Sequence, residues 1–175
     1  MALLKALFLD RDGVINIEKE YLYKIEDFEF IDGVFELCRH DQVLGYIIIV
    51  VTNQSGIARG YYSEDDFSKL TRWMLKEFKK NNIEIKEVSF CPHHPDINGE
   101  CSCRKPKPGM LLDVAKKFDI DLKSSIMIGD KERDIEAGLN AGLSEVYLFD
   151  ENKSIKKSKA TKIVSKLKDI YSADS

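Results

Sequence analysis

Near its amino end the chain reads Ala6-Leu7-Phe8-Leu9-Asp10-Arg11-Asp12-Gly13-Val14. The apolar run at residues 6–9 is too short for a helix of its own and is typical of a buried strand. Two carboxylates follow at once, and Gly13 allows the chain to turn away. In an α/β sheet the carboxyl ends of the strands border the usual ligand crevice. The stretch therefore predicts an α/β fold with Asp10 and Asp12 at its ligand-binding edge, although a solvated turn is the simpler interpretation of D-x-D-G alone.

The rest of the chain alternates apolar strands with amphipathic helices. Strands are predicted over residues 4–9, 46–52, 87–90, 125–128 and 146–149, and helices over residues 33–44, 63–81, 108–118, 131–141 and about 160–171. Near-continuous apolar strands separated by helices are typical of a mainly parallel sheet covered on both faces. We therefore expect one three-layer, Rossmann-like domain over residues 1–175. A Lys- and Ser-rich linker is expected at residues 151–159, and loops at residues 15–31 and 91–104 should wall the pocket.

Composition limits the possible functions. The chain has 175 residues, of which 43% are hydrophobic and 33% charged, with a net charge of −3. An acidic balance argues against a generic nucleic-acid binder. No apolar run has the length of a membrane span, and the first residues lack the features of a signal peptide. We therefore expect a cytoplasmic protein, in which four cysteines are better metal ligands than disulfide partners.

A second strand end is followed by polar residues in Thr52-Asn53-Gln54-Ser55-Gly56. A hydroxyl followed by backbone N–H groups in a Gly-containing turn can hold phosphate oxygens. The same pattern is equally typical of a turn with hydroxyl caps.

A third strand end carries Asp130, followed by Asp134. On its own Asp130 is more typical of a helix N-cap. Two carboxylates about 4 Å apart repel by about 4 kcal/mol at an effective dielectric constant near 20, so acids gathered from several strand ends need a cation or a shared proton. Oxygen ligands of this kind suit Mg²⁺, which favours a phosphate partner.

A cysteine- and histidine-containing loop begins at Cys91-Pro92-His93-His94 and continues to Cys101-Ser102-Cys103. Three thiolates and one imidazole suit a closed, tetrahedral structural zinc site, whereas free thiols are the alternative. His93 is favoured over His94 because it repeats the C-x-X rhythm of the two later cysteines. Arg104 and Lys105 follow directly, and cations held between zinc and a Pro-Gly turn can bind phosphate with little ordering cost. A solvated basic turn would have the same sequence.

The four elements in this order resemble the haloacid dehalogenase superfamily of phosphatases. Its motifs are matched by Asp10 with Asp12, by Thr52, by Lys105, and by Asp130 with Asp134. The stretches DRDGVIN, VTNQSGIARG, CPHHP, CSCRKPKPGM and GDKERDIEAG are similar to the family of D-glycero-D-manno-heptose-1,7-bisphosphate 7-phosphatases. That family is capless and carries a zinc loop. Some members have a longer insertion between the zinc ligands than the seven residues that separate His93 from Cys101 here.

The resemblance implies a role for each matching residue. Asp10 would be the nucleophile and Asp12 the acid/base, while Asp10, the backbone carbonyl of Asp12 and Asp130 would hold Mg²⁺. Thr52 and Lys105 would bind the transferring phosphoryl group, and Arg104 the distal phosphate. The zinc ligands would be Cys91, His93, Cys101 and Cys103. Further substrate-binding residues would be Glu18, Lys19, Glu20, Tyr21, Asn53, Gln54, Ser55 and Lys131.

Three alternatives remain beside this interpretation. Histidinol-phosphate phosphatase is a close relative with the same motifs, but a second phosphate gives Arg104 a role, and the stretch from Gln54 to Gly60 looks more like the heptose enzyme. A phosphate-accepting signalling domain would use a similar strand-end Asp, Thr and Lys, but it would avoid the acid/base that Asp12 supplies. A zinc-dependent nucleic-acid module is ranked last. The expected partner is a small sugar phosphate, with no nucleic acid or membrane, and the expected state is a monomer.

Overall fold

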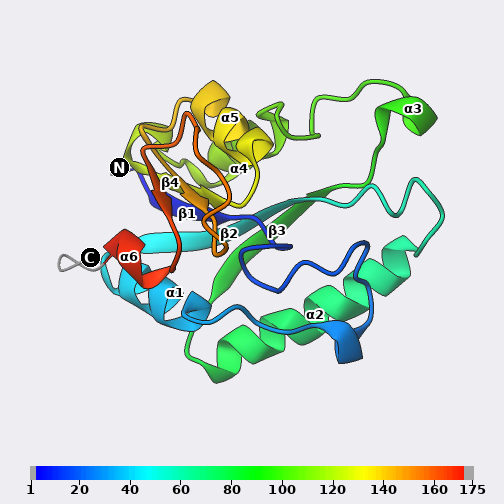
Figure 1. Ribbon diagram of the computed structural model, residues 1–175, viewed down its shortest axis with the longest axis horizontal. Coiled ribbons are helices and arrows are strands. Elements are labelled where there is room, and N and C mark those ends of the chain that lie inside the picture. Colours follow the sequence, from blue (N-terminus) through cyan, green and yellow to red (C-terminus); the bar gives the residue numbers. More distant parts are fainter. Residues whose placement is uncertain (1–2, 172–175) are drawn as a thin grey trace.

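The computed structural model describes residues 3–171 and contains a parallel sheet with helices on both faces (Figure 1). Over these residues the sheet has six strands, in the order β3-β2-β1-β4-β5-β6. The strands are β1 (Lys5–Leu9), β2 (Tyr46–Asn53), β3 (Ile85–Cys91), β4 (Ile126–Gly129), β5 (Glu145–Phe149) and β6 (Lys162–Val164). The helices are α1 (Val34–Val43), α2 (Glu64–Lys80), α3 (Pro95–Asn98), α4 (Gly109–Phe118), α5 (Glu132–Ala141) and α6 (Lys168–Tyr171), with 3-10 turns η1 (Ile25–Asp27) and η2 (Leu122–Ser124). The predicted fold class is confirmed.

The central strand β1 divides its side chains between two apolar cores. Leu7 and Leu9 join the core under α1 and α2, whereas Ala6 and Phe8 join the core under α4 and α5. This alternation follows from the two-residue period of a strand. Figure 1 shows the two helical layers on either side of the sheet. Because β1 has no polar side chain between residues 6 and 9, both faces can be buried.

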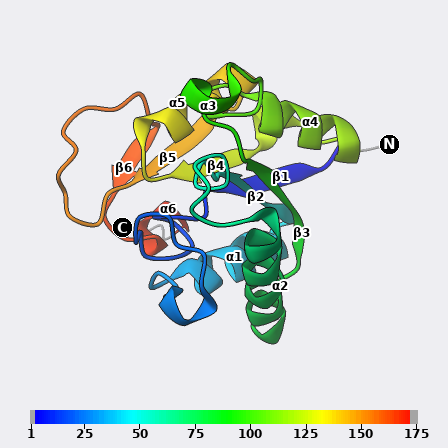
Figure 2. The same ribbon diagram turned by 90° about the vertical axis from the view of Figure 1, so that its right-hand side faces the viewer.

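The order of the strands reverses beside β1. The chain runs outward from β1 through β2 to β3 and then returns to β4, which pairs with the other side of β1. Such a reversal leaves a crevice at the carboxyl ends of the strands. Figure 2 looks onto this edge, where the loops after β1, β2 and β3 gather. The residues that follow these strands therefore meet in space.

The carboxyl-terminal region differs from the prediction. A helix was expected over residues 160–171, but the chain forms β6, parallel to β5, and then the short α6. The β-branched pair Ile163 and Val164 lies beside Leu148 and Phe149, where burial against a neighbouring strand outweighs the helical pattern.

The expected linker at residues 151–159 is tied to the body of the protein by hydrogen bonds. Asp150 accepts the backbone N–H of Ile155 at 2.6 Å, and Glu132 accepts the Ser158 hydroxyl at 2.8 Å. The short helix α3 inside the cysteine loop was also not predicted. Among residues 3–171 no helix is long and apolar enough to cross a membrane.

Candidate active site

Asp10 lies at the carboxyl end of β1 beside a fully buried lysine. The ammonium group of Lys105 is 3.0 Å from Asp10 Oδ1 and 2.7 Å from Asp134 Oδ1, and it also donates to the Val51 carbonyl at 2.9 Å. Lys105 is 2% exposed and Asp134 is fully buried. Burial by itself would lower the pKa of Lys105, but the two carboxylates more than compensate and raise it. Lys105 therefore stays charged and fixes both acids.

Asp130 brings a third carboxylate to this point from the end of β4. Its pKa is raised to about 6, mainly by burial and then by Asp134. The pKa of Asp10 is also raised well above its usual range, by burial first and then by Asp134. A Cβ on Gly13 would lie 2.0 Å from Asp130 Oδ2, and the φ of +90° there also favours glycine. Gly13 thus makes the room that Asp130 occupies.

The carboxylates are arranged as a divalent cation would need them. Oxygen atoms of Asp10, Asp130 and Asp134 all lie within 4.8 Å of one another. Asp130 Oδ1 is buried and has no hydrogen-bond partner within residues 3–171. A magnesium ion binds oxygen at about 2.0–2.1 Å and is usually held by one or two carboxylates, so this donor set fits it. Lys105 contacts one oxygen of Asp10 and one of Asp134, but the second oxygen of Asp134 also accepts the backbone N–H groups of Asp130 and Lys131. Asp10 and Asp130 are therefore the better ligands.

Asp12 is held by three donors. Arg11 Nη2 and Asn16 Nδ2 donate to its Oδ1 at 2.9 and 3.0 Å, and Gln54 Nε2 donates to its Oδ2 at 3.1 Å. Arg11 also donates to the Leu22 carbonyl at 3.0 Å, which ties the loop after β1 to the site. The acid is therefore fixed in orientation beside Asp10.

The end of β2 supports the segment that carries Lys105. Asn53 exchanges two hydrogen bonds with the Lys105 backbone, donating at 3.2 Å and accepting at 3.0 Å. Thr52 is 1% exposed and accepts a hydrogen bond from Gln54 at 2.9 Å. The strand end thus fixes the segment from which Lys105 projects.

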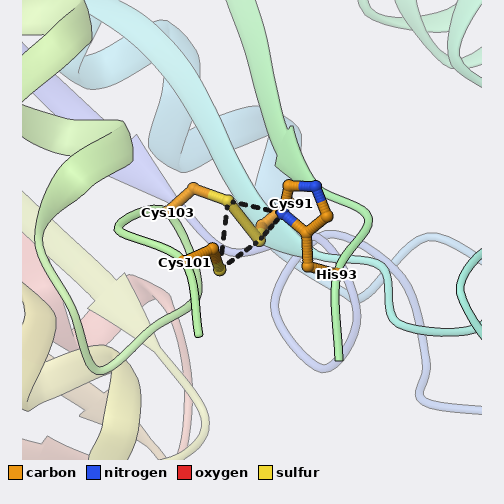
Figure 3. A group of neighbouring side chains, drawn as sticks. All are labelled: Cys91, His93, Cys101 and Cys103. Carbon is orange, nitrogen blue, oxygen red and sulfur yellow. Dashed lines mark hydrogen bonds between the residues drawn. A yellow bond between two sulfur atoms is a disulfide. The ribbon is translucent and has the colours of Figure 1, made fainter. Parts of the chain in front are cut away.

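The four predicted zinc ligands form one cluster, shown in Figure 3. The sulfur of Cys101 is 3.6 Å from those of Cys91 and Cys103, and Nδ1 of His93 is 3.6 Å from Cys91 and 3.4 Å from Cys103. Zn–S bonds of about 2.3 Å at tetrahedral angles place two ligands about 3.7 Å apart, so these distances fit zinc. His94 lies outside the cluster, with its ring between Asp96 and Arg59.

The structure also contains a bond that the sequence did not predict. Cys91 and Cys103 are joined as a disulfide, whereas thiols were expected at all four positions, and Cys38 and Cys101 are free. The two sulfurs come together because the β3 end and the later cysteine loop converge on the same point. A disulfide uses two of the four clustered residues, whereas a zinc ion would use all of them.

A cavity of about 390 Å³ lies above Asp10 and Asp12. Its walls include most of the predicted substrate-binding residues, namely Glu18, Glu20, Tyr21, Asn53, Gln54, Ser55, Arg104, Lys105 and Lys131. Two predicted residues are not among the lining residues: Thr52 is buried, and Lys19 pairs with Glu29 at 2.6 Å. Burial and then Asp12 raise the pKa of Glu18, as expected for an acid beside the other carboxylates.

Two arginines in the wall were not predicted. Arg59 and Arg133 line the cavity together with Arg104. The pKa of Arg104 is lowered by burial, then by Arg133, and further by Arg59, so the three guanidinium groups lie close enough to repel. Each arginine stands a few residues after a predicted motif, but nothing in the sequence shows that their side chains converge. An anion with several oxygen atoms would relieve this repulsion.

Comparisons with known proteins agree with this geometry. Residues 102–170 match the model of the HAD-hydrolase-like family. The D-glycero-alpha-D-manno-heptose-1,7-bisphosphate 7-phosphatase of Campylobacter jejuni is 58% identical over 149 residues, covering 85% of this chain and 84% of that protein. The D-glycero-beta-D-manno-heptose-1,7-bisphosphate 7-phosphatase of Pasteurella multocida is 46% identical over 155 residues, covering 86% and 84%. A solved D,D-heptose 1,7-bisphosphate phosphatase from B. bronchiseptica, complexed with magnesium and phosphate, is similar with a TM-score of 0.81 and 27% identity over 94% of each chain.

Proposed function

The chain belongs to the heptose-1,7-bisphosphate 7-phosphatase family of HAD-like hydrolases, and on this premise we propose that it removes the C7 phosphate of D-glycero-D-manno-heptose 1,7-bisphosphate. It is a phosphoric monoester hydrolase. The single observation that carries this choice of substrate is the pairing, in one cavity, of the Asp10 carboxylate with a cluster of three arginines. A substrate with two phosphates uses both groups at once, whereas a substrate with one phosphate leaves the arginines without an anion.

The reaction divides into two transfers. Asp10 attacks phosphorus, and the bond from phosphorus to the sugar oxygen breaks while Asp12 gives that oxygen a proton. Asp12, now ionised, then takes a proton from the water that attacks the aspartyl-phosphate, which releases phosphate and restores Asp10. Lys105 and Thr52 hold the phosphoryl oxygens during both transfers. Asp10 after β1, Thr52 in β2 and Lys105 in the loop before α4 are held in place before substrate binds, and such preorganised groups contribute strongly to lowering the barrier.

We propose two metal ions. Asp10, Asp130 and the backbone carbonyl of Asp12 would hold Mg²⁺, which would offset the negative charge of the transferring phosphoryl group. Cys91, His93, Cys101 and Cys103 would hold a structural Zn²⁺ in place of the disulfide. That zinc would stiffen the loop that carries Arg104 and Lys105.

We propose that Arg59 and Arg133 join Arg104 at the C1 phosphate, and that Glu18, Glu20, Tyr21, Asn53, Ser55 and Lys131 border the sugar. Lys19 stays outside this proposal because of its pairing with Glu29. The arginines favour the bisphosphate over the histidinol phosphate of the alternative enzyme. We further propose one phosphatase domain over residues 1–175 that acts as a monomer.

The test is phosphate release from the heptose bisphosphate and from histidinol phosphate, with Mg²⁺ and with EDTA. We expect release from the bisphosphate only with the metal, and kcat/KM for histidinol phosphate lower by at least about tenfold. Asp10→Asn should abolish release, whereas Asp113→Asn, an exposed acid on α4, should not change it. A preference for histidinol phosphate would overturn the substrate assignment. Labelling of Asp10 without turnover would favour the signalling domain instead.

A further inference from the structure

The two oxygens of the Asp12 carboxylate have different surroundings. Oδ1 accepts hydrogen bonds from Arg11 and Asn16, which fill both of its lone pairs. Oδ2 accepts one hydrogen bond from a described residue, that of Gln54 Nε2 at 3.1 Å. Oδ2 therefore keeps a lone pair for a proton, while Oδ1 does not.

Gln54 controls the direction of Oδ2. Its side chain is 2% exposed, and Nε2 donates both to Asp12 Oδ2 and to Thr52 Oγ1. The opposite orientation of the amide would place its oxygen against the carboxylate, which has no proton to offer when ionised. The hydroxyl of Tyr62 donates to Gln54 Oε1 and selects the orientation in which Nε2 faces the acid.

Tyr62 is itself held in place. Its ring is 7% exposed and stacks on Tyr23, with centroids 5.4 Å apart and planes 12° apart. A Cβ on Gly56 would lie 2.2 Å from the Tyr62 ring, so glycine is needed for the ring to reach Gln54. Burial raises the pKa of Tyr62 to about 12, which keeps its hydroxyl protonated as a donor at neutral pH.

We propose that Tyr62 is a positioning residue that acts through Gln54 to aim Oδ2 of Asp12, the oxygen that carries the transferred proton. In the first transfer the Oδ2–H bond breaks as the P–O bond to the sugar breaks. The electron pair of the P–O bond stays on the sugar oxygen, which takes the proton and becomes a hydroxyl. The inference rests on the proposed function, because it assumes that Asp12 is the acid.

Two substrates with different leaving groups test this role. Nitrophenolate leaves without a proton, whereas a sugar alkoxide needs one, so only the sugar phosphate depends on a well-aimed acid. The quantity to compare is kcat/KM, which covers the steps up to formation of the aspartyl-phosphate. We expect Tyr62→Phe to lower kcat/KM for the heptose bisphosphate about tenfold and that for p-nitrophenyl phosphate less than about twofold. A loss that is equal for both substrates, or no loss, would overturn the inference.

Two further variants separate the possible explanations. Gln54→Met keeps the volume but removes the amide, and it should reproduce the selective loss if Tyr62→Phe fails to fold. Tyr46→Phe removes a hydroxyl at the amino end of β2, remote from the pocket, and should leave kcat/KM unchanged for both substrates. If Asp12→Asn also lowers kcat/KM equally for both substrates, Asp12 is not the acid of the proposed function. If Asp12→Asn lowers kcat/KM mainly for the heptose bisphosphate and Tyr62→Phe lowers it equally for both substrates, only the role of Tyr62 is wrong.

Discussion

Individual acids in this protein are held close together by the fold, with their charges only partly balanced. Asp10, Asp12, Asp130 and Asp134 face two buried cations, Lys105 and Arg11. Like charges in a dry site are costly unless a cation or proton offsets them. The raised pKa values of Asp10 and Asp130 show the direction of this imbalance.

Neutralising Asp130 should stabilise the metal-free protein at neutral pH. Its pKa is about 6 in the folded state and about 4 in an unfolded chain. Between these values the folded state binds more protons than the unfolded state, so the free energy of unfolding decreases as the pH rises through this window. In EDTA we expect the free energy of unfolding of Asp130→Asn to exceed that of the wild type by about 2–3 kcal/mol at about pH 7.5 and to equal it near pH 4.

Thermal unfolding at both pH values measures this effect, with Asp113→Asn as the control. Mg²⁺ should raise the melting temperature of the wild type and leave that of Asp130→Asn unchanged. A variant that melts below the wild type at neutral pH in EDTA would contradict the assignment of unbalanced charge to this site.

Removing the buried cation should have the opposite effect. Lys105→Met leaves Asp10 and Asp134 buried without their partner, at distances of 3.0 and 2.7 Å from the former ammonium. We expect the free energy of unfolding to fall by about 3–5 kcal/mol at neutral pH, because uncompensated buried charges are strongly destabilising. The loss should shrink at acid pH, because the raised pKa of Asp10 lets that carboxylate take up a proton and lose its charge. Urea unfolding at the two pH values measures it, and Lys116→Met on the exposed face of α4 is the control.

At the scale of elements, the loop between β3 and α4 depends on its cysteine–histidine cluster. It contains the single-turn α3 and no strand among its described residues, so it has little core of its own. Cys91 lies at the end of β3, and Cys103 directly precedes Arg104 and Lys105. Whatever joins these ends also positions two cationic side chains in the pocket.

The state of the cluster can be read from its thiols and its metal content. If zinc is bound, the protein should contain about one zinc per chain and four thiols after denaturation, whereas the disulfide leaves Cys38 and Cys101. We expect Cys101→Ser to lose the zinc and to melt at a lower temperature, because metal binding contributes to folding. Cys38→Ser, in the core under α1, should keep the zinc. Two thiols and no metal in protein purified under reducing conditions would rule out the zinc assignment.

At the scale of the whole molecule, β6 (Lys162–Val164) completes one edge of the sheet that the structure describes. Val164 in β6 and Leu167 before α6 both join the core that contains Leu7 and Leu9. This region therefore contributes to the stability of the same core that supports Asp10, instead of being an appendage.

Leu167→Ala should accordingly destabilise the whole protein. The side chain is 1% exposed, and truncating a buried leucine costs about 2–5 kcal/mol. Chemical unfolding should show one transition at a lower denaturant concentration, and Lys166→Ala, at the exposed neighbouring position, should leave it unchanged. If Leu167→Ala leaves the denaturant midpoint unchanged, residues 160–171 do not contribute to the stability of the sheet.

The patterns near strand ends could be read without coordinates because they are local. An apolar run followed by Asp10, Thr52 or Asp130 predicts a polar residue at the edge of a parallel sheet, and the sheet brings all such edges together. The same is true of the cysteine and histidine spacing, which identified the clustered residues. The prediction of a helix over residues 160–171 was wrong. Residues 162–164 pair with β5, and the local sequence alone does not show this contact with another segment.

The sequence by itself determined the fold class, the family and the acids at the strand ends, because short-range patterns and motifs record them. Only the tertiary structure decided that Lys105 lies between Asp10 and Asp134, that Arg59 and Arg133 join Arg104, and that Tyr62 reaches Gln54. The contacts of Lys105 and of the three arginines join segments that are far apart in the chain, whereas Tyr62 and Gln54 lie in one loop whose shape depends on its packing. Their geometry depends on the packing of the whole sheet, which no local pattern specifies.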